Sequence, residues 1–292
     1  MHLETLKVFC DVVETKSFSA AASQNFVTQS AVSQQIRTLE ERYGRRLLER
    51  TRGNVQLTPA GDILYQVSKE IVQRYHEMEA RLQALTQVVA GTIRVATVHS
   101  IGLYELSGQI KRYLKAFPQV HLHLEYSRAS KIYEDALKGN IDLGVVAYPS
   151  RRPQITVVPF RNDRLVLVCP PAHPLARHRQ VSVRKLAGEP LVGYERDIPT
   201  RKETDRLLRR YGVEARYVME LDNIETIKRV VEIGTGVAIL PEPAVRPEVK
   251  GKTLVAVQLS DEVFTRPLGI IHRQGKHFSP AAEKFIEHLR AQ

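Results

Sequence analysis

Cysteine is scarce in this chain of 292 residues, which contains only Cys10 and Cys169. The two are far apart in the sequence, so a structural disulfide is not expected, and this suits a reducing compartment. Cys10 lies among the apolar residues of a predicted helix, and Cys169 ends a predicted apolar strand. Because a reactive thiol needs surroundings that stabilise the thiolate, both are predicted to be buried, inert thiols and not redox sensors.

The sequence also lacks an apolar run of membrane-spanning length, and it has no charged-then-apolar signal at its N-terminus. It contains no GxxxxGK loop, no HExxH and no GxSxG. The run 234–236 (GTG) follows a predicted helix and precedes a predicted strand, the wrong order for a dinucleotide-binding loop. His121 and His123 lack a third metal ligand. We therefore predict a cytoplasmic protein that is not an enzyme and has no catalytic residues, metal, cofactor or membrane contact.

Basic residues are in excess, 43 against 32 acidic ones, which gives a formal net charge of +11 that fits a nucleic-acid-binding protein. Residues 1–90 contribute little, with 11 basic and 10 acidic residues, so most of the excess lies beyond residue 90. That excess suggests an anionic ligand, although solvated surface charge is the alternative. Within the first 90 residues, a local cluster able to neutralise phosphates consists of Arg37, Arg42, Arg45, Arg46, Arg50 and Arg52.

Residues 17–58 have the pattern of a helix-turn-helix followed by a β-hairpin. Thr28 is placed to cap the second helix, and Gly44 to end it. The apolar residues expected on the buried faces of the two helices are Phe18, Ala21, Ala22, Phe26, Ala31, Val32, Ile36 and Leu39. Two short strands around a Gly53-Asn54 turn would then form a basic wing that lies against phosphates.

The outer face of the second helix carries hydrogen-bonding side chains of the kind that read base edges in the major groove. These residues are Gln29, Ser30, Ser33, Gln34 and Arg37. We expect Gln29, Ser33 and Gln34 to contact bases. The residues expected to hold phosphates are Thr28, Arg37, Arg50, Arg52 and Thr58.

A long helix is predicted to begin at Thr58-Pro59 and to run without glycine or proline from Gly61 to about Ala90. Its apolar residues recur every three or four positions, the spacing of a coiled-coil seam: Leu64, Val67, Ile71, Tyr75, Met78, Leu82, Leu85 and Val89. An isolated helix would leave this seam exposed, which favours pairing with a second copy; packing on the chain's own second domain is the alternative. Two reading helices in a dimer would recognise an inverted repeat.

Beyond Gly91, apolar strands alternate with helices, and this predicts parallel α/β architecture in two successive units. Ligands of such sheets bind at the carboxyl ends of the strands, where helix N-termini direct amides toward an anion. The segments expected at those ends are 99–102, 127–130, 147–148, 199–201 and 222–225.

The N-terminal helix-turn-helix, the run Arg50-Thr51-Arg52 before the turn, and the run 57–61 (LTPAG) that opens the long helix resemble the LysR-type transcriptional regulators. The resemblance extends over essentially the whole chain. It implies a winged helix-turn-helix domain (1–58), a linker and dimerisation helix (59–90) and a two-lobed, periplasmic-binding-protein-like effector domain (91–292). The chain would cross between the lobes near 160–163 and 264–267, so lobe I comprises 91–162 and 266–292, and lobe II comprises 163–265.

Matching the family places Ser100, Ser127, Thr200 and Asn223 at the cleft between the lobes, with Ser100 and Thr200 facing each other. Each is also an ordinary helix-capping residue, so a capping role stays open. Arg128 and Arg201 would be charge partners for a carboxylate, phosphate or sulfate.

The resemblance implies a DNA-binding regulator in which a small anionic effector closes the lobes and alters how dimers pair on DNA. Its expected partners are double-stranded DNA with an inverted-repeat operator, the effector, further copies of itself as a homodimer or homotetramer, and RNA polymerase. The alternative is a small-molecule binding protein of the solute-binding type without a regulatory role. The helix-turn-helix and the linker helix favour regulation.

Overall fold

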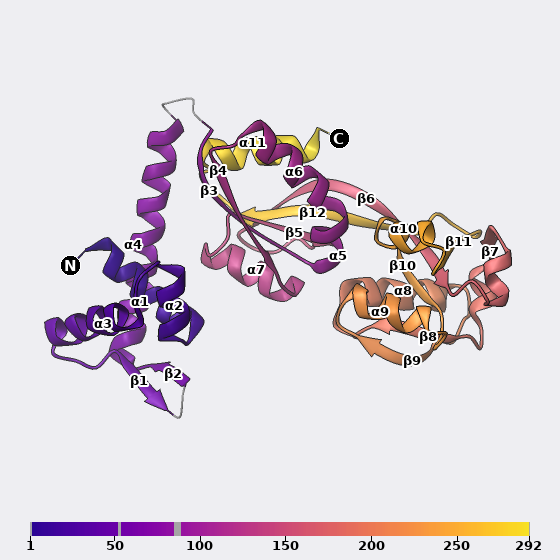
Figure 1. Ribbon diagram of the computed structural model, residues 1–292, viewed down its shortest axis with the longest axis horizontal. Coiled ribbons are helices and arrows are strands. Elements are labelled where there is room, and N and C mark those ends of the chain that lie inside the picture. The colour runs from indigo at the N-terminus through magenta and orange to yellow at the C-terminus, as the bar shows by residue number, and fades with distance from the viewer. Residues whose placement is uncertain (1, 52–53, 85–88, 292) are drawn as a thin grey trace. The chain divides into compact units, whose positions relative to one another are not determined.

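The computed structural model describes residues 2–51, 54–84 and 89–291 (Figure 1). The chain divides into two compact units, Met1–Thr86 and Gln87–Gln292. No helix in the described ranges is both long and apolar enough to cross a membrane.

The first unit is a helical domain with a two-stranded hairpin. Its elements are α1 (Leu3–Thr15), α2 (Phe18–Gln24), α3 (Gln29–Tyr43), β1 (Leu48–Thr51), β2 (Asn54–Leu57) and α4 (Pro59–Ala84). The core includes Phe9, Phe18, Val32 and Ile36. Strands β1 and β2 pair antiparallel, as the predicted wing requires. The predicted helix-turn-helix with a wing is confirmed.

Local signals set the boundaries of α3. The Thr28 hydroxyl accepts a hydrogen bond from the amide of Ala31 at 3.2 Å, so Thr28 caps the helix as predicted. At the other end Gly44 has φ +59°, a conformation that glycine adopts without steric cost.

The prediction for Phe26 was wrong, because this side chain is 96% exposed. Helix α2 ends at Gln24, and Phe26 has φ +54°, outside the helical region. The Asn25 side chain holds this turn by donating to the Asp11 carboxylate at 2.6 Å and to the carbonyl of Ala21 at 2.9 Å. The helical spacing therefore stops short of Phe26, and the left-handed backbone turns its ring into solvent.

Replacing Phe26 with asparagine is expected to raise the free energy of unfolding by about 0.5–1 kcal/mol. Asparagine tolerates the left-handed region better than a bulky side chain does, and no buried contact is lost. Urea denaturation of the full-length protein measures the change. Val27→Asn is the matched control, because it makes a similar apolar-to-polar change without relieving a positive φ. A gain as large in Val27→Asn, or none in Phe26→Asn, would contradict the explanation.

Helix α4 begins as predicted but does not extend as far. The Thr58 hydroxyl accepts from the amide of Gly61 at 3.0 Å and so caps the helix. The described helix ends at Ala84, and Val89 and Ala90 are not helical. Val89 packs against the core of the second unit, and Leu85 lies outside the described residues. The remaining apolar stripe is exposed on the single chain at Val67, Ile71, Tyr75, Met78 and Leu82.

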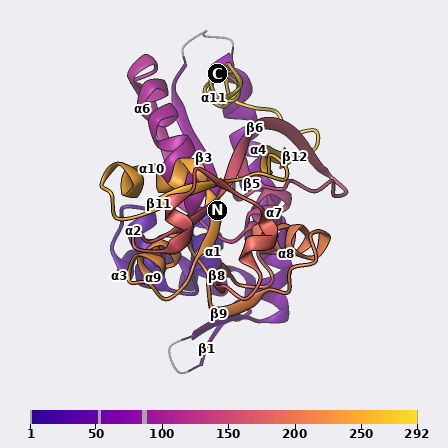
Figure 2. The same ribbon diagram turned by 90° about the vertical axis from the view of Figure 1, so that its right-hand side faces the viewer.

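The second unit begins with a three-layer α/β lobe, lobe I. Its first elements are β3 (Gly91–Thr97), α5 (His99–Ile101), a π-helical turn η1 (Gly102–Leu106), α6 (Ser107–Ala116), β4 (Val120–Tyr126), α7 (Ala129–Lys138) and β5 (Leu143–Ala147). The chain returns to this lobe through β12 (Thr265–Arg273) and α11 (Pro280–Arg290). Helices α6 and α11 lie on one face of the sheet and α7 on the other (Figures 1 and 2). Their side chains contribute to two separate core clusters.

The rest of the unit, lobe II, follows the long strand β6 (Ile155–Cys169), which runs from one lobe into the other. It contains β7 (Gln180–Val181), β8 (Pro190–Tyr194), α8 (Pro199–Arg210), β9 (Arg216–Leu221), α9 (Ile224–Glu232), β10 (Ala238–Pro241), α10 (Glu242–Lys250) and β11 (Val255–Leu259), with short 3-10 turns at Pro174–Arg177 and Val183–Leu186. Helix α10 and strand β11 were not predicted.

The strands are not all parallel, which corrects the prediction from the alternating pattern. Strands β3, β4 and β5 are parallel, but β12 is antiparallel to both β5 and β6. Alternating helices and strands predict parallel pairing only where a crossover helix joins neighbouring strands within one lobe. Strands β6 and β12 are not joined to their neighbours in this way. They connect the two lobes, and their pairing aligns Arg266 with Asp163.

Candidate nucleic-acid interface and ligand cavity

The candidate nucleic-acid interface is the outer face of α3. Gln29, Ser30 and Gln34 are exposed there, and Ser33 is half-buried. Arg37 is exposed and pairs with Glu41 one turn along the helix, with 2.9 Å between Nε and Oε1. Such an exposed pair is worth little, so it leaves the guanidinium able to exchange partners.

The wing is fastened to the same helix. The Glu40 carboxylate of α3 accepts from the amides of Leu47 and Leu48 at 2.8 and 3.3 Å. Arg50 belongs to β1, but its side chain, like the whole of Arg52, lies outside the described residues.

Two of the predicted phosphate-contacting hydroxyls are engaged within the chain. The Thr58 hydroxyl donates to the carbonyl of Arg46 at 2.7 Å besides capping α4. The structure thus gives Thr58 a capping role. Thr28 caps α3 and lies 2.9 Å from the Ser30 hydroxyl, but it remains exposed beside the outer face of α3.

A cavity of about 570 Å³ lies between the two lobes of the second unit. Both lobes line it, and it has the size of a site for a small organic ligand. Five of the six predicted effector residues line it: Ser100, Ser127, Arg128, Thr200 and Asn223.

Three helices begin at this cavity without a side-chain cap: α5 after Val98, α7 after Arg128 and α8 after Ile198. Uncapped first-turn amides favour an anion where their donors are unsatisfied within the helix. Pro199 has no N–H, and the amides of Ile101 and Arg201 already donate to the carbonyls of Val98 and Ile198, so the other first-turn amides are the ones available. Asn223 differs, since its side chain accepts from the amides of Glu225 and Thr226 at 3.1 Å each. For Asn223 the structure therefore provides a capping role directly.

Arg266 is the main residue of the cavity that sequence reasoning missed. It lines the cavity, although it is only 1% exposed. Its guanidinium forms an ion pair with Asp163 and donates to the Ser100 hydroxyl at 2.9 Å. Because that hydroxyl oxygen already accepts a bond, the Ser100 proton is left to donate toward a ligand. Two features of the sequence could have pointed to Arg266. It is an arginine in an apolar strand, and it lies in the segment predicted to cross between the lobes.

Tyr194 also lines the cavity, and its buried hydroxyl has no hydrogen-bond partner within the described part of the chain. Burial raises the pKa of Tyr194 well above its ordinary value, so the phenol is a neutral donor at physiological pH. A buried donor without a partner is costly, and a bound ligand would satisfy it.

The cavity wall carries charges of both signs. Arg128 of lobe I pairs with Glu195 at 2.6 Å and Asp197 at 3.2 Å, both in lobe II. Arg128 and Asp197 are exposed and Glu195 is half-buried, so these two ion pairs across the mouth of the cavity contribute only weakly to holding the lobes together. Arg152 and Lys202 also line the wall and were not predicted.

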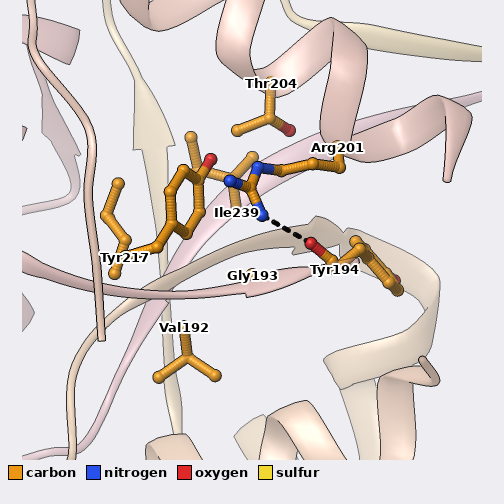
Figure 3. A pocket seen from close by; sticks show the side chains of 8 residues that line it. Val192, Gly193, Tyr194, Arg201, Thr204, Tyr217 and Ile239 are labelled. Atoms are coloured by element: carbon orange, nitrogen blue, oxygen red, sulfur yellow. Dashed lines mark hydrogen bonds between the residues drawn. The ribbon is translucent and has the colours of Figure 1, made fainter. Parts of the chain in front are cut away.

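Arg201 is not among the lining residues, which corrects the expectation that it is an effector partner. Its guanidinium is buried beside β8, stacked 3.4 Å from the ring centre of Tyr217. It donates to the carbonyl of Tyr194 at 2.6 Å (Figure 3). It also pairs with Asp205 and Glu220. Successive residues of a helix point in different directions, so Arg201 points away from the cavity that Thr200 lines. Its charge is paired within lobe II instead.

Both cysteines are buried, as predicted. Burial raises the pKa of Cys10 to about 12 and that of Cys169 to about 11. At pH 8 both are therefore thiols, which react slowly.

We expect neither thiol of the native protein to react with Ellman's reagent at pH 8, and both to react after unfolding. A cysteine placed at exposed Arg209 is the positive control. Reaction of a native thiol at the rate of that control would show that burial does not suppress its reactivity.

A winged helix-turn-helix and a two-lobed α/β unit with a ligand-sized cavity define a DNA-binding regulator that responds to a small molecule. Family comparison identifies it further. Residues 3–62 match the bacterial regulatory helix-turn-helix proteins of the lysR family, and residues 86–292 match the LysR substrate binding domain. The chain belongs to the LysR family of transcriptional regulators, which are not enzymes.

Relatives match over the full length. The chain is 30% identical to the RuBisCO operon transcriptional regulator of Allochromatium vinosum, covering 98% of this chain and 95% of the relative. It is 27% identical to the HTH-type transcriptional regulator CysL of Bacillus subtilis (strain 168), covering 100% and 97%.

Solved structures show the same fold. A full-length OxyR variant from Pseudomonas aeruginosa has a TM-score of 0.74 at 22% identity and covers 100% of this chain and 94% of its own. Full-length CbnR in complex with its target DNA has a TM-score of 0.71 at 22% identity, covering 100% and 99%.

Proposed function

We propose that this regulator binds an inverted-repeat operator through α3 and the wing as a homodimer, or a tetramer of two dimers, and is switched by a small anionic effector in the cavity between its lobes. The observation that carries the effector class is the convergence of three uncapped helix N-termini on one cavity. Ser100 and the unpartnered Tyr194 hydroxyl add neutral donors to those amides.

In this proposal Gln29, Ser33 and Gln34 contact bases, with Ser30 beside them. Thr28, Arg37, Arg50 and Arg52 hold phosphates. We keep the predicted domain boundaries as part of this proposal: 1–58, 59–90 and 91–292, with lobe I formed by 91–162 and 266–292 and lobe II by 163–265. Within 59–90, the described helix α4 ends at Ala84. The protein acts in the cytoplasm, where RNA polymerase is its further partner. The CbnR–DNA complex and the RuBisCO operon and CysL relatives support DNA binding.

A thermal-shift screen of the full-length protein against small anions tests the effector. Sulfate, phosphate, amino-acid derivatives and aromatic acids are the probes, since a bound anion raises the melting temperature by mass action. Ser100→Ala and Thr200→Val should remove the shift, whereas Arg201→Lys, which alters a buried residue outside the cavity, should lower the melting temperature but keep the shift. A shift that survives both cavity substitutions would place the anion elsewhere.

DNA reading is tested separately on an operator selected from random duplexes by the wild-type protein. Gln34→Ala should weaken binding to the operator by about tenfold or more with little effect on random DNA. Arg37→Ala should weaken both equally and reduce the salt dependence. Equal losses on both duplexes for Gln34→Ala would remove Gln34 from the base-reading set.

A further inference from the structure

The π-helical turn η1 contacts both lobes next to the ligand cavity. It directly follows α5, whose His99 and Ser100 line that cavity. Within η1, Leu106 belongs to the core of lobe I, whereas Tyr104 packs against the core of lobe II. Turns of this kind are rare and are frequent at functional sites.

Close packing fixes the start of the turn. A Cβ atom at Gly102 would lie 2.5 Å from a ring carbon of Tyr126 and 2.8 Å from the Thr97 methyl carbon. Only glycine lets η1 approach the lobe I sheet this closely.

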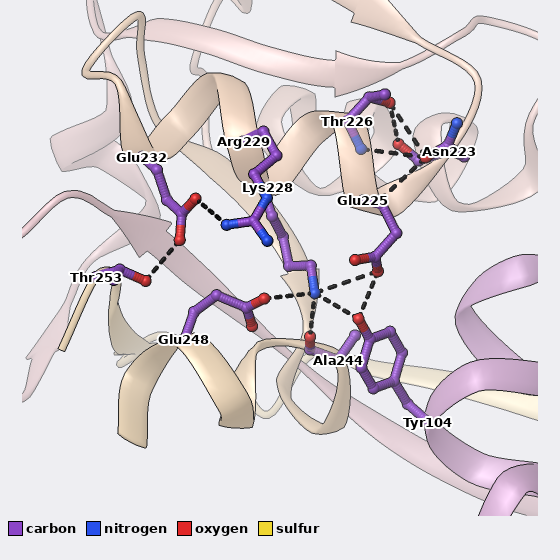
Figure 4. A network of polar contacts seen from close by, with 10 residues as sticks. All are labelled: Tyr104, Asn223, Glu225, Thr226, Lys228, Arg229, Glu232, Ala244, Glu248 and Thr253. Carbon is purple, nitrogen blue, oxygen red and sulfur yellow. Dashed lines mark hydrogen bonds and ion pairs between the residues drawn. The ribbon is translucent and has the colours of Figure 1, made fainter. Parts of the chain in front are cut away.

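Half-buried Tyr104 enters a polar network of lobe II that surrounds the buried Lys228. Its hydroxyl donates to Glu225 of α9 and accepts from the Lys228 ammonium (Figure 4). Lys228 is 1% exposed and also donates to Glu248 at 2.8 Å and to the carbonyl of Ala244 at 3.1 Å. One tyrosine of lobe I thus completes the shell of a buried cation in lobe II.

The neighbouring residue of the turn holds the strand between the lobes. Glu105 is buried and accepts from Arg161 of β6 at 2.7 Å. The turn is therefore fixed to lobe I by its backbone packing, to the connecting strand by Glu105, and to lobe II by Tyr104.

The charge states make this network costly to disturb. Burial by itself lowers the pKa of Lys228, but the hydrogen bonds with Glu248 and Tyr104 outweigh it and raise the pKa overall, so the lysine stays charged. Burial raises the pKa of Tyr104, which stays a neutral donor. A buried charge that loses a partner is strongly destabilised, unlike the exposed Arg128 pair at the cavity mouth.

We propose that Tyr104 and Lys228 are positioning residues of the effector site, forming the pivot about which the two lobes move. The network joins the helix that carries Ser100 to α9, which begins at the cavity with Ile224. It fixes the separation of these two walls, while the exposed Arg128 contacts at the mouth open and close. The positioning role of Tyr104 and Lys228 in the effector site rests on the proposed function. Their role as a pivot between the lobes does not depend on it.

The test measures the distance between the lobes in the full-length protein without any ligand. Spin labels are attached at Glu134→Cys of α7 and Arg209→Cys of α8, both exposed, in a background of Cys10→Ser and Cys169→Ala. Excess unlabelled protein removes distances between copies. Tyr104→Phe should broaden the distribution of inter-lobe distances, because Lys228 and Glu225 lose their link to lobe I.

Tyr113→Phe is the matched control. It also removes one buried tyrosine hydroxyl bond, from Tyr113 to the carbonyl of Ala281 at 2.7 Å, but both residues belong to lobe I. It should lower the melting temperature and leave the distance distribution as in wild type. Equal distributions for Tyr104→Phe and wild type, or equal broadening in both variants, would overturn the pivot.

A second readout concerns the effector site. Tyr104→Phe should weaken binding of an anion identified by the thermal-shift screen about tenfold, and Tyr113→Phe should leave it unchanged. Unchanged affinity in Tyr104→Phe would overturn the positioning role. If no anion binds the wild type, the proposed effector function fails, while the distance measurement still decides the pivot.

Discussion

Arg266→Ala is expected to lower the free energy of unfolding by about 3–5 kcal/mol, the cost of leaving a buried charge without its partner. Arg266 and Asp163 are both almost fully buried, and they pair where β12 and β6 lie side by side between the lobes. Removing the guanidinium leaves the Asp163 carboxylate without its cation and the Ser100 hydroxyl without its donor. Urea denaturation of the full-length protein, followed by circular dichroism, measures the loss.

Two further variants separate the ion pair from general damage to the strand. Arg164→Ala removes an exposed arginine from the same segment and should change stability by less than about 0.5 kcal/mol. The double variant Arg266→Met with Asp163→Leu should recover much of the stability, because it leaves no unpaired charge. A loss in Arg266→Ala no larger than that in Arg164→Ala would show that the pair does not support the fold.

Ile71→Glu is expected to convert the protein into a monomer and to reduce operator affinity by about a hundredfold or more, since two linked half-sites bind far more tightly than one. Ile71 lies in the exposed apolar stripe of α4 that we propose as the dimer seam. A carboxylate there would have to be buried without a partner in the dimer. Light scattering after size-exclusion chromatography measures the mass, and fluorescence anisotropy measures the affinity.

Gln66→Glu is the control, because it adds the same charge at an exposed polar position of α4. It should leave both mass and affinity near the wild-type values. A dimer that survives Ile71→Glu would remove the stripe from the proposed interface, and loss of operator binding in Gln66→Glu would point to charge alone.

The sequence was sufficient where structure depends on neighbours along the chain. The cap at Thr28, the stop at Gly44 and the apolar spacing of α3 are local, so this helix was predicted with its boundaries. Phe26 marks the limit, because α2 ends at Gln24, earlier than its apolar spacing suggests. The Asn25–Asp11 hydrogen bond that holds this turn joins residues 14 positions apart. The spacing of apolar residues along a helix cannot predict such a contact.

In the candidate ligand site, too, the sequence predicted some features and only the tertiary structure decided others. Strand ends followed by helix starts placed the segments 99–102, 127–130 and 199–201 at the cavity, because parallel strands bring their carboxyl ends together. The family resemblance then selected Ser100, Ser127 and Thr200 within them. The sequence by itself thus determined the class of protein, its helix-turn-helix and the location of its cavity. Only the tertiary structure decided that Arg201 is committed to lobe II while Arg266 pairs with Asp163 and orients Ser100. Those contacts depend on the packing of α8 and on the register of β6 with β12, which pairs residues about a hundred positions apart and which no local pattern specifies.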